Sequence, residues 1–293
     1  MVTLKSVING LNRKQEVPNL IQNLSVMKTK RLFILCSIVA LGFAACSPKA
    51  ENTNEPYGNP PAEGFNLEGS DAKAMAIADE VMEAMGGREA WDNTRHLCWN
   101  FFGRRELIWD KWTGDVRIDM SNTTYLLNIN DDSGKVFKDG EELALKGDSL
   151  QTLVNRGKSI WINDSYWLVM PYKLKDSGVT LTFAGEEATQ DGRMADKLKM
   201  TFEGVGRTPQ NMYNVWVDKE SRLVTQWAYY PTTDAEEPRF INPWKDYKKM
   251  GNIMLSGERE TAQLSNIMVF DDLPESVYKS AEKPDLKIEG ASE

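Results

Sequence analysis

The sequence of 293 residues contains only three cysteines and one histidine. The single histidine, His96, excludes an HExxH zinc site and any other metal site that needs several histidines, and it leaves little basis for a Ser-His-Asp triad. The glycine spacings of Walker and Rossmann phosphate sites are also missing. We therefore expect no bound metal ion, no cofactor and no enzymatic activity.

A short apolar segment lies near the amino terminus. Residues 28–31, Lys-Thr-Lys-Arg, precede an apolar run that ends in Leu-Gly-Phe-Ala-Ala at residues 41–45, directly before Cys46. The run is shorter than the roughly 20 residues that a membrane-spanning helix needs, and its order of basic, apolar and small residues is typical of a secretory signal peptide. Residues 41–46 resemble the bacterial lipobox. The resemblance implies cleavage before Cys46, acylation of Cys46 and attachment to a membrane through these acyl groups.

The signal peptide is predicted to span residues 27–45, because Met27 directly precedes the basic cluster. Residues 1–26 are then an upstream extension that does not contribute to the fold. We expect the protein to lie in the bacterial cell envelope, lipid-anchored at the outer membrane and facing the periplasm. Ser47 after the cysteine is compatible with this location, because the inner-membrane retention signal of enteric bacteria has Asp at that position. Exposure at the cell surface is the alternative.

The processed chain is strongly acidic. Of 35 basic and 43 acidic residues, six basic and one acidic residue precede Cys46, which leaves 29 basic and 42 acidic residues and a formal net charge of about −13. Such a surface repels nucleic acid and anionic headgroups, so nucleic acid is excluded as a partner. Membrane attachment must then depend on the acyl groups of Cys46.

Cys98 is the one cysteine that remains for the folded part of the chain. It lies in the run His-Leu-Cys-Trp-Asn-Phe-Phe at residues 96–102, which is typical of a strand. A lone thiol cannot form an internal disulfide, so stability must come from a hydrophobic core. We interpret Cys98 as a small buried apolar residue rather than a nucleophile.

Two features introduce the folded domain. Residues 46–69 are rich in Pro, Asn, Glu and Gly and are predicted to form a disordered tether. Residues 71–85 then repeat apolar side chains every three or four positions, and Gly86-Gly87 follow, which predicts one amphipathic helix.

Most of the remaining sequence is typical of antiparallel strands. Apolar and polar residues alternate in several runs, separated by turn sequences such as Asp139-Gly140 and Asp191-Gly192. The clearest runs are 116–120, 179–183, 197–202, 212–217 and 223–230. About ten strands in one β-rich domain are expected at residues 70–280, followed by a polar tail at 281–293.

The middle of the chain differs from this pattern. Residues 149–156 are predicted to form a short helix, and residues 159–170 a second helix that ends before Pro171. The second helix is apolar on all sides, so it should lie inside the fold. The predicted fold class is mainly β with a few helices: a single-domain, incomplete antiparallel β-barrel with helices on its concave side.

The same residues carry a family resemblance. The segments 161–179, 109–115 and 198–208 resemble a family of uncharacterised bacterial envelope lipoproteins, which is similar to the LolA-like and LppX-like outer-membrane lipoprotein-sorting proteins. The resemblance covers roughly residues 70–275. It implies a half-barrel whose concave face holds acyl chains or another lipid.

Aromatic residues are the main candidates for ligand contacts, because they combine a large apolar area with a polar group. The predicted ligand-binding residues are Trp109, Trp112, Trp161, Ile162, Tyr166, Trp167 and Met170. Core packing in a twisted sheet is the alternative role for each tryptophan. Asp164 interrupts the apolar helix, so it should cap the helix, pair with Arg or Lys, bond a neighbouring loop or have a function.

The leading hypothesis is a non-enzymatic, lipid-anchored envelope protein that binds a hydrophobic ligand, either an acyl chain or the lipid of another lipoprotein, in a half-barrel cavity. One alternative is a carbohydrate-binding or glycoside-processing lipoprotein, which would use tryptophans and a facing pair of carboxylates. Another alternative is a structural module with a filled core.

Overall fold

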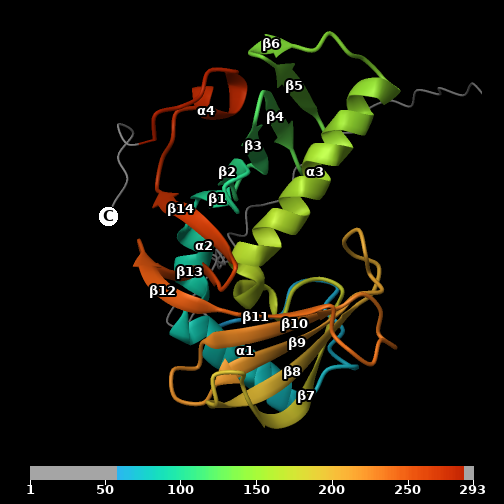
Figure 1. The fold of residues 1–293 in the computed structure, drawn as a ribbon, viewed down its shortest axis with the longest axis vertical. Helices are drawn as coiled ribbons and strands as arrows, with labels where there is room; N and C mark the ends of the chain where they lie inside the picture. Colours follow the sequence, from blue (N-terminus) through green and yellow to red (C-terminus); the bar gives the residue numbers. More distant parts are fainter. Residues whose placement is uncertain (1–57, 287–293) are drawn as a thin grey trace, which may run out of the picture. The chain divides into compact units, whose positions relative to one another are not determined.

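The computed structural model describes residues 58–286 (Figure 1), all within one compact unit, Asn52–Glu293. The predicted upstream extension, signal peptide and lipidation site at Cys46 lie outside the described residues. Within residues 58–286, no helix has the length and apolar character that crossing a membrane requires.

Two antiparallel sheets make up most of the fold. The nine-stranded sheet has, in spatial order, β12 (Lys245–Met250), β13 (Ile253–Arg259), β14 (Ala262–Phe270), β1 (His96–Phe101), β2 (Arg105–Asp110), β3 (Asp115–Met120), β4 (Thr123–Asn128), β5 (Gly134–Lys138) and β6 (Glu141–Glu142). The five-stranded sheet has β11 (Phe240–Pro243), β10 (Val224–Tyr230), β9 (Met212–Asp218), β8 (Met194–Phe202) and β7 (Val179–Ala188).

The alternating sequence runs are confirmed as strands: four fall within β3, β7, β8 or β9, and the run 223–230 matches β10 except for its first residue, Leu223. Fourteen strands are present among residues 58–286, more than the ten expected. The additional strands have weak sequence patterns. Strand β12, for example, reads Lys-Asp-Tyr-Lys-Lys-Met and lies at a sheet edge. Charged residues are common on edge strands because they oppose pairing with other chains, so this run lacks apolar alternation.

The two sheets are joined where the chain passes from β11 to β12. Only Trp244 separates these strands, and its backbone N–H donates to the carbonyl of Thr225 on β10 at 2.8 Å. Strand β11 pairs with β10 in the five-stranded sheet, whereas β12 pairs with β13 in the nine-stranded sheet. At the far ends, β6 and β7 each pair with one described strand. The series of strands is therefore open, and the predicted incomplete antiparallel barrel is confirmed.

A single long helix, α3 (Asp148–Val169), follows β6, runs beside β5, β4 and β3 of the nine-stranded sheet and ends next to the five-stranded sheet (Figure 1). The prediction of two helices, 149–156 and 159–170, is wrong at their junction. Gly157 costs a helix about 1 kcal/mol relative to Ala, but its lack of a side chain lets α3 approach β4. A Cβ atom at Gly157 would lie 2.5 Å from Leu127 Cδ2 and 3.0 Å from Tyr125 Cδ1. Tertiary packing thus continues the helix through this position, and the short 3-10 helix Met170–Lys173, which contains Pro171, ends it.

The predicted amphipathic helix at 71–85 is confirmed as α1 (Ala72–Ala84), which packs on β7. Its buried side chains, Ala74, Ile77, Ala78, Val81 and Met82, recur with helical spacing. Gly86 ends the helix with φ of 111°, and a Cβ atom there would lie 2.3 Å from the carbonyl oxygen of Asn252. Glycine is therefore required at this turn. The short helices α2 (Arg88–Asn93) and α4 (Ser276–Lys279) complete the fold.

The ordered domain is longer than the predicted range 70–280 at both ends. Residues 58–69 were expected to belong to a disordered tether, but Phe65 is buried and the N–H of Asn66 donates to the carbonyl of Val179 on β7 at 2.9 Å. This segment satisfies backbone groups of an edge strand, which stabilises its packed position. At the other end Leu286 is buried, and the Lys283 ammonium pairs with Glu106 at 2.7 Å, so residues 281–286 belong to the domain.

The main hydrophobic core lies between the sheets and includes side chains of α1, α3 and both sheets. A smaller core around Ile108 and Phe270 lies beneath the C-terminal segment and contains Cys98. Cys98 is fully buried and unpaired, as the sequence indicated, and burial raises the pKa of its thiol. The thiol is therefore inert at neutral pH.

Candidate ligand-binding site

The carboxyl-terminal half of α3 places aromatic side chains against the five-stranded sheet. The Tyr166 ring centroid lies 5.5 Å from that of Tyr213 and 6.4 Å from that of Phe202. The Trp167 ring packs edge-on against Trp227, with centroids 4.9 Å apart. Side chains from β8, β9 and β10 thus meet the end of α3 in one layer of rings.

Trp167 also connects this layer to the turn between β1 and β2 of the other sheet. Its centroid is 5.2 Å from that of Phe102 in the turn and 5.4 Å from that of Phe240 on β11. We call the half-buried aromatic residues of this region the aromatic cluster: Phe102, Tyr166, Trp167, Phe202, Tyr213, Tyr229 and Phe240. Each keeps part of its surface accessible to solvent.

Several polar atoms in and beside the aromatic cluster are buried without a hydrogen-bond partner. They are the Tyr166 hydroxyl and the indole nitrogens of Trp109, Trp161 and Trp227. Burial raises the pKa of the Tyr166 hydroxyl well above 10, so this group stays neutral. A buried polar group without a partner costs about 1–3 kcal/mol. The interior therefore retains unused hydrogen-bonding capacity.

The predicted ligand-binding residues do not form one surface. Tyr166 and Trp167 belong to the aromatic cluster, whereas Trp161 packs edge-on against the largely buried Trp109 of β2, with centroids 5.1 Å apart. Ile162 is half-buried on α3, and Met170 is fully buried in the core. Trp112 is 58% exposed at the β2–β3 turn, where its indole N–H donates to the carbonyl of Asp92.

The sequence reasoning missed the partners that the five-stranded sheet contributes, Phe202, Tyr213, Tyr229 and Phe240. Phe202 shares the alternation of Leu198 and Met200, which already indicated that it lies on the inner face. No comparable signal marks Phe240, because β11 has only four residues.

A buried ion pair holds α3 to the nine-stranded sheet. The guanidinium Nε of Arg105 on β2 donates to Oδ2 of Asp164 at 2.6 Å, and the Asn163 amide donates to Oδ1 at 2.9 Å. Asp164 is fully buried, and burial raises its pKa above 3.8 even though the bonds from Arg105 and Asn163 act in the opposite direction. Of the alternatives expected for Asp164, the structure shows pairing with an arginine.

Arg259 fixes the end of α3 from the other side. This fully buried side chain donates to the carbonyl of Trp167 at 2.8 Å and to the Ser256 hydroxyl at 2.9 Å, and its guanidinium lies 3.6 Å from the Trp244 ring centroid. Burial lowers the pKa of Arg259 to about 9. The last turn of α3 is thus bonded to β13.

Two cavities in the described part of the chain lie away from the aromatic cluster. One of about 90 Å³ is lined by Pro60, Trp91 and Tyr172, and one of about 280 Å³ by polar residues including Glu106, Thr124 and Lys283. Neither is lined by a predicted ligand-binding residue. The side chains of α3 instead pack into the core on the concave side.

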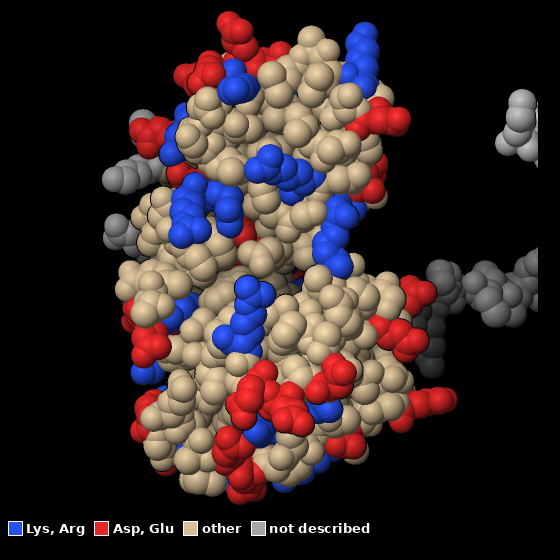
Figure 2. All heavy atoms as spheres, turned by 45° about the vertical axis from the view of Figure 1, so that its right-hand side comes forward, with Lys and Arg blue, Asp and Glu red and all other residues tan. Residues whose placement is uncertain are grey.

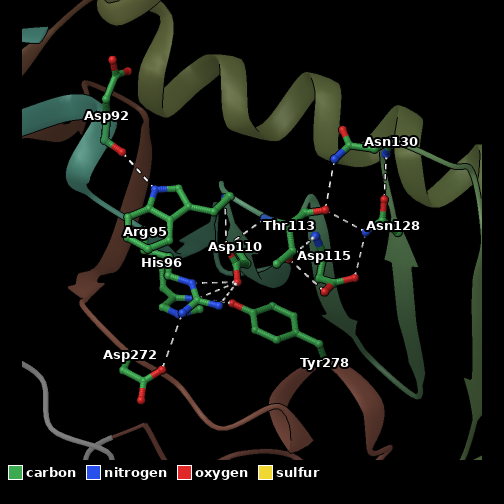
Figure 3. Close-up of polar contacts among 11 residues, drawn as sticks. Asp92, Arg95, His96, Asp110, Thr113, Asp115, Asn128, Asn130, Asp272 and Tyr278 are labelled. Carbon is green, nitrogen blue, oxygen red and sulfur yellow. Dashed lines mark hydrogen bonds and ion pairs between the residues drawn. The ribbon is translucent and has the colours of Figure 1, made fainter. Parts of the chain in front are cut away.

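His96, the single histidine, lies in a separate polar cluster around Asp110 (Figure 3). Its Nδ1 is 2.8 Å from the Tyr278 hydroxyl and 3.8 Å from Asp110 Oδ2, and Arg95 pairs with the same carboxylate at 3.0 Å. Burial alone would raise the pKa of Asp110. The bonds from Arg95 and from backbone N–H groups outweigh this effect, so its pKa is below 3.8.

This polar cluster connects β1, the β2–β3 turn and α4. Burial lowers the pKa of His96, so the imidazole is neutral at pH 7. Its direct partner is a tyrosine hydroxyl whose pKa burial raises, which makes Tyr278 unsuited to act as a nucleophile. Among residues 58–286, no group of three His, Cys, Asp or Glu side chains could hold a metal ion.

The fold and site together define an open antiparallel barrel, crossed on its concave side by one helix that ends in a half-exposed aromatic cluster.

No protein-family model matches the chain, and no curated protein matches it. It is similar to a solved DUF1329 family protein from Desulfovibrio piger, with 16% identity and a TM-score of 0.42, over 70% of this chain and 96% of that one. A LolA superfamily protein from Nitrosomonas europaea has 9% identity and a TM-score of 0.32, over 70% and 96% of the two chains. An uncharacterised conserved protein from Thermus thermophilus has 9% identity and a TM-score of 0.24, over 73% and 95%.

Proposed function

We propose that this protein is a lipid-anchored protein of the bacterial envelope that binds a hydrophobic ligand between α3 and the five-stranded sheet. The ligand is an acyl chain, either of a free lipid or of another lipoprotein. The aromatic cluster is the observation that supports the proposal, because its half-buried rings and the unpaired Tyr166 hydroxyl lie together beside the sheet. Ligand sites commonly combine such apolar surface with a few polar groups.

The contacts of α3 favour this side for ligand entry. Toward the nine-stranded sheet, α3 is held by the Arg105–Asp164 pair and by the close approach of Gly157. Toward the five-stranded sheet, the side chains of Tyr166 and Trp167 make ring contacts. Such ring pairs contribute about 0.5–1.5 kcal/mol each beyond their buried area. An acyl chain that enters here would break some of these ring pairs, and its own contacts with the same rings would offset much of the stabilisation that is lost.

A lipid anchor at Cys46 and a site for acyl chains would both place the domain close to a membrane. Acyl groups on Cys46 would hold the domain near a membrane, and residues 47–57 would connect the anchor to the first described residue. We place the protein at the outer membrane, facing the periplasm. The predicted lipobox at residues 41–46 supports this part of the proposal.

A structural module with a filled core is the second candidate function. It is favoured by the side chains of α3, which pack into the core where a cavity was expected. The two candidates differ in one measurable property, since a filled module takes up no lipid.

The test uses the chain from Ser47 onward, which lacks Cys46 and contains the whole compact unit Asn52–Glu293. Native mass spectrometry and titration with the neutral probe N-phenyl-1-naphthylamine would measure bound lipid and uptake. We expect co-purified lipid and saturable uptake. A clean apo mass together with no uptake would support the filled module instead.

Matched variants locate the site. Phe240→Asp places a carboxylate in the aromatic cluster, whereas Trp112→Asp places one at an exposed aromatic residue outside it. Burying a charge beside an acyl chain is costly, so Phe240→Asp should lose most of the uptake and Trp112→Asp should retain it. Thermal melting of both variants would show that the fold is intact. Equal uptake by the two variants would contradict a site at the aromatic cluster.

A further inference from the structure

Four arginines among residues 58–286 form no ion pair: Arg104, Arg156, Arg207 and Arg239. Arg259 bonds backbone carbonyls and a serine hydroxyl in the core. The remaining described arginines each pair with Asp or Glu, namely Arg88, Arg95, Arg105, Arg117, Arg193 and Arg222. Five of the eleven described arginines therefore have no carboxylate partner, and four of these five are exposed.

The four unpaired arginines all belong to α3 or to segments that contact it. Arg156 is an exposed residue of α3, and the guanidinium of Arg207, in the β8–β9 loop, donates to the carbonyl of Asn155 on α3 at 3.0 Å. Toward the other end of α3, Arg104 lies in the β1–β2 turn between Phe102 and Arg105. Arg239 directly precedes Phe240, whose ring packs on Trp167.

One face of α3 extends from the region of Arg156 and Arg207 to the region of Arg104 and Arg239. Positions 156, 160, 163 and 167 follow helical spacing, so Arg156 and Trp167 lie on the same face, about 16 Å apart along the axis. Ile160 and Asn163 lie between them, and both are at least partly exposed. This face of α3, which carries Ile160, Asn163 and Trp167, therefore has arginines without ion pairs near each end.

The charge distribution of this face is unusual for the protein. In Figure 2 the right-hand side of Figure 1 comes forward. Lys and Arg side chains surround the hollowed middle region of this view, and Asp and Glu gather above and below it. The chain after Cys46 carries a formal net charge of about −13, by the count of its basic and acidic residues. A local excess of unpaired arginine beside aromatic rings is opposite to that background. Guanidinium groups bind carboxylate and phosphate with two parallel hydrogen bonds.

We propose that the hydrophobic ligand is an anionic lipid, with its acyl chain against the aromatic cluster and its charged headgroup held by one of the two arginine pairs, Arg156 with Arg207 or Arg104 with Arg239. This inference rests on the proposed binding function and adds the charge of the ligand. A neutral lipid would give none of the four guanidinium groups an anionic partner, whereas an anionic headgroup would give one to the pair that holds it.

The experiment compares two probes that share one chain and differ only in charge, cis-parinaric acid and its methyl ester, at pH 8 with the chain from Ser47 onward. We expect the acid to bind about tenfold more tightly than the ester at low salt, the combined effect of two partly exposed charge contacts. The ratio of the two affinities should fall as the salt concentration is raised to about 0.5 M, because the contacts are partly exposed.

Two double variants, Arg156→Gln with Arg207→Gln and Arg104→Gln with Arg239→Gln, then locate the headgroup. One of them should bring the acid-to-ester ratio close to one while leaving ester binding unchanged. Arg193→Gln is the control for loss of a positive charge elsewhere, because it removes one guanidinium at an exposed residue that pairs with Asp191. This control should keep the preference of the wild type.

The outcomes separate the two proposals. If neither probe binds, the proposed function fails and this inference fails with it. If both probes bind equally well in the wild type, ligand binding stands and the anionic headgroup is refuted. Retention of the preference in both double variants, or its loss in Arg193→Gln, would also refute the inference. The salt dependence of the wild type provides a readout that does not depend on whether any variant folds.

Discussion

Replacing Arg105 by Gln tests whether the buried ion pair with Asp164 holds α3 to the nine-stranded sheet. The pair joins the carboxyl-terminal half of α3 to β2 at 2.6 Å. Asp164 is fully buried, whereas the Arg105 side chain is 20% exposed. The substitution leaves a buried carboxylate whose remaining side-chain partner is the amide of Asn163.

The expected loss of stability follows from the interaction and its surroundings. Two unit charges about 4 Å apart attract each other by about 4 kcal/mol at an effective dielectric constant of 20. Arg105 loses part of its hydration when it packs, which reduces the net value. Removal of one partner from a buried pair typically costs about 3–5 kcal/mol. We expect a loss of about 3 kcal/mol for Arg105→Gln, or a fall in Tm of roughly 6–12 °C for a domain of this size.

The pH dependence of this loss has a definite sign. The pKa of Asp164 is raised in the folded protein, so the folded state binds the Asp164 proton more tightly than the unfolded state does. Without the Arg105 bonds, which lower this pKa, it should rise further. Protonation then removes the unpaired buried charge as the pH falls. Arg105→Gln should therefore be less destabilised at about pH 5 than at about pH 7.5.

Urea unfolding of the wild type, Arg105→Gln, Asp164→Asn and the double variant would measure these terms. In the double variant the buried charge is absent, so it should be more stable than Arg105→Gln alone. A loss below about 1 kcal/mol for Arg105→Gln, or a double variant with the sum of both losses, would refute the reasoning.

Two further predictions concern Lys111 and Cys46. Burial lowers the pKa of Lys111 from 10.5 to about 7, although its ammonium donates to the carbonyls of Trp91 and Thr94. Between these pH values the folded state binds fewer protons than the unfolded state, so Lys111 makes the free energy of unfolding rise with pH from 7 to 10.5. Urea unfolding at several pH values should show a shallower rise of this free energy for Lys111→Met. An unchanged pH dependence in Lys111→Met would contradict the lowered pKa of Lys111. Cys46→Ala should abolish incorporation of radiolabelled palmitate and release the protein from membranes. The control Cys98→Ala should retain both the label and the membrane attachment. Incorporation of label into Cys46→Ala would contradict lipidation at Cys46.

Local patterns in the sequence predicted much of the fold. The spacing of Ala74, Ile77 and Val81 predicted α1, and alternation such as Leu198, Met200 and Phe202 predicted the inner faces of strands. These predictions succeed because helix and strand periods place side chains on one face whatever the neighbours are. The buried position of Cys98 followed from its apolar surroundings in the same way.

Other features depend on contacts between distant segments. Two helices, 149–156 and 159–170, were predicted, yet α3 continues through Gly157 between them because β4 requires a residue without a side chain at that point. The packing of residues 58–69 depends on an unpaired edge of β7, which a composition rich in Pro, Asn, Glu and Gly does not reveal. Trp112 and Trp167 look alike in the sequence, but only Trp167 reaches the aromatic cluster.

The sequence alone therefore predicted the β-rich class and the opening helix, which are confirmed, and the lipidation site at Cys46, which stays a prediction, since each depends on residues close together in the chain. Only the tertiary structure decided that one continuous helix, α3, occupies the concave side in place of the two predicted helices, and that Asp164 meets Arg105. It also decided that Arg104, Arg156, Arg207 and Arg239 share the region around one helix without carboxylate partners. These arginines are separated by up to 135 residues of chain, and only the pairing of strands around α3 brings their segments together.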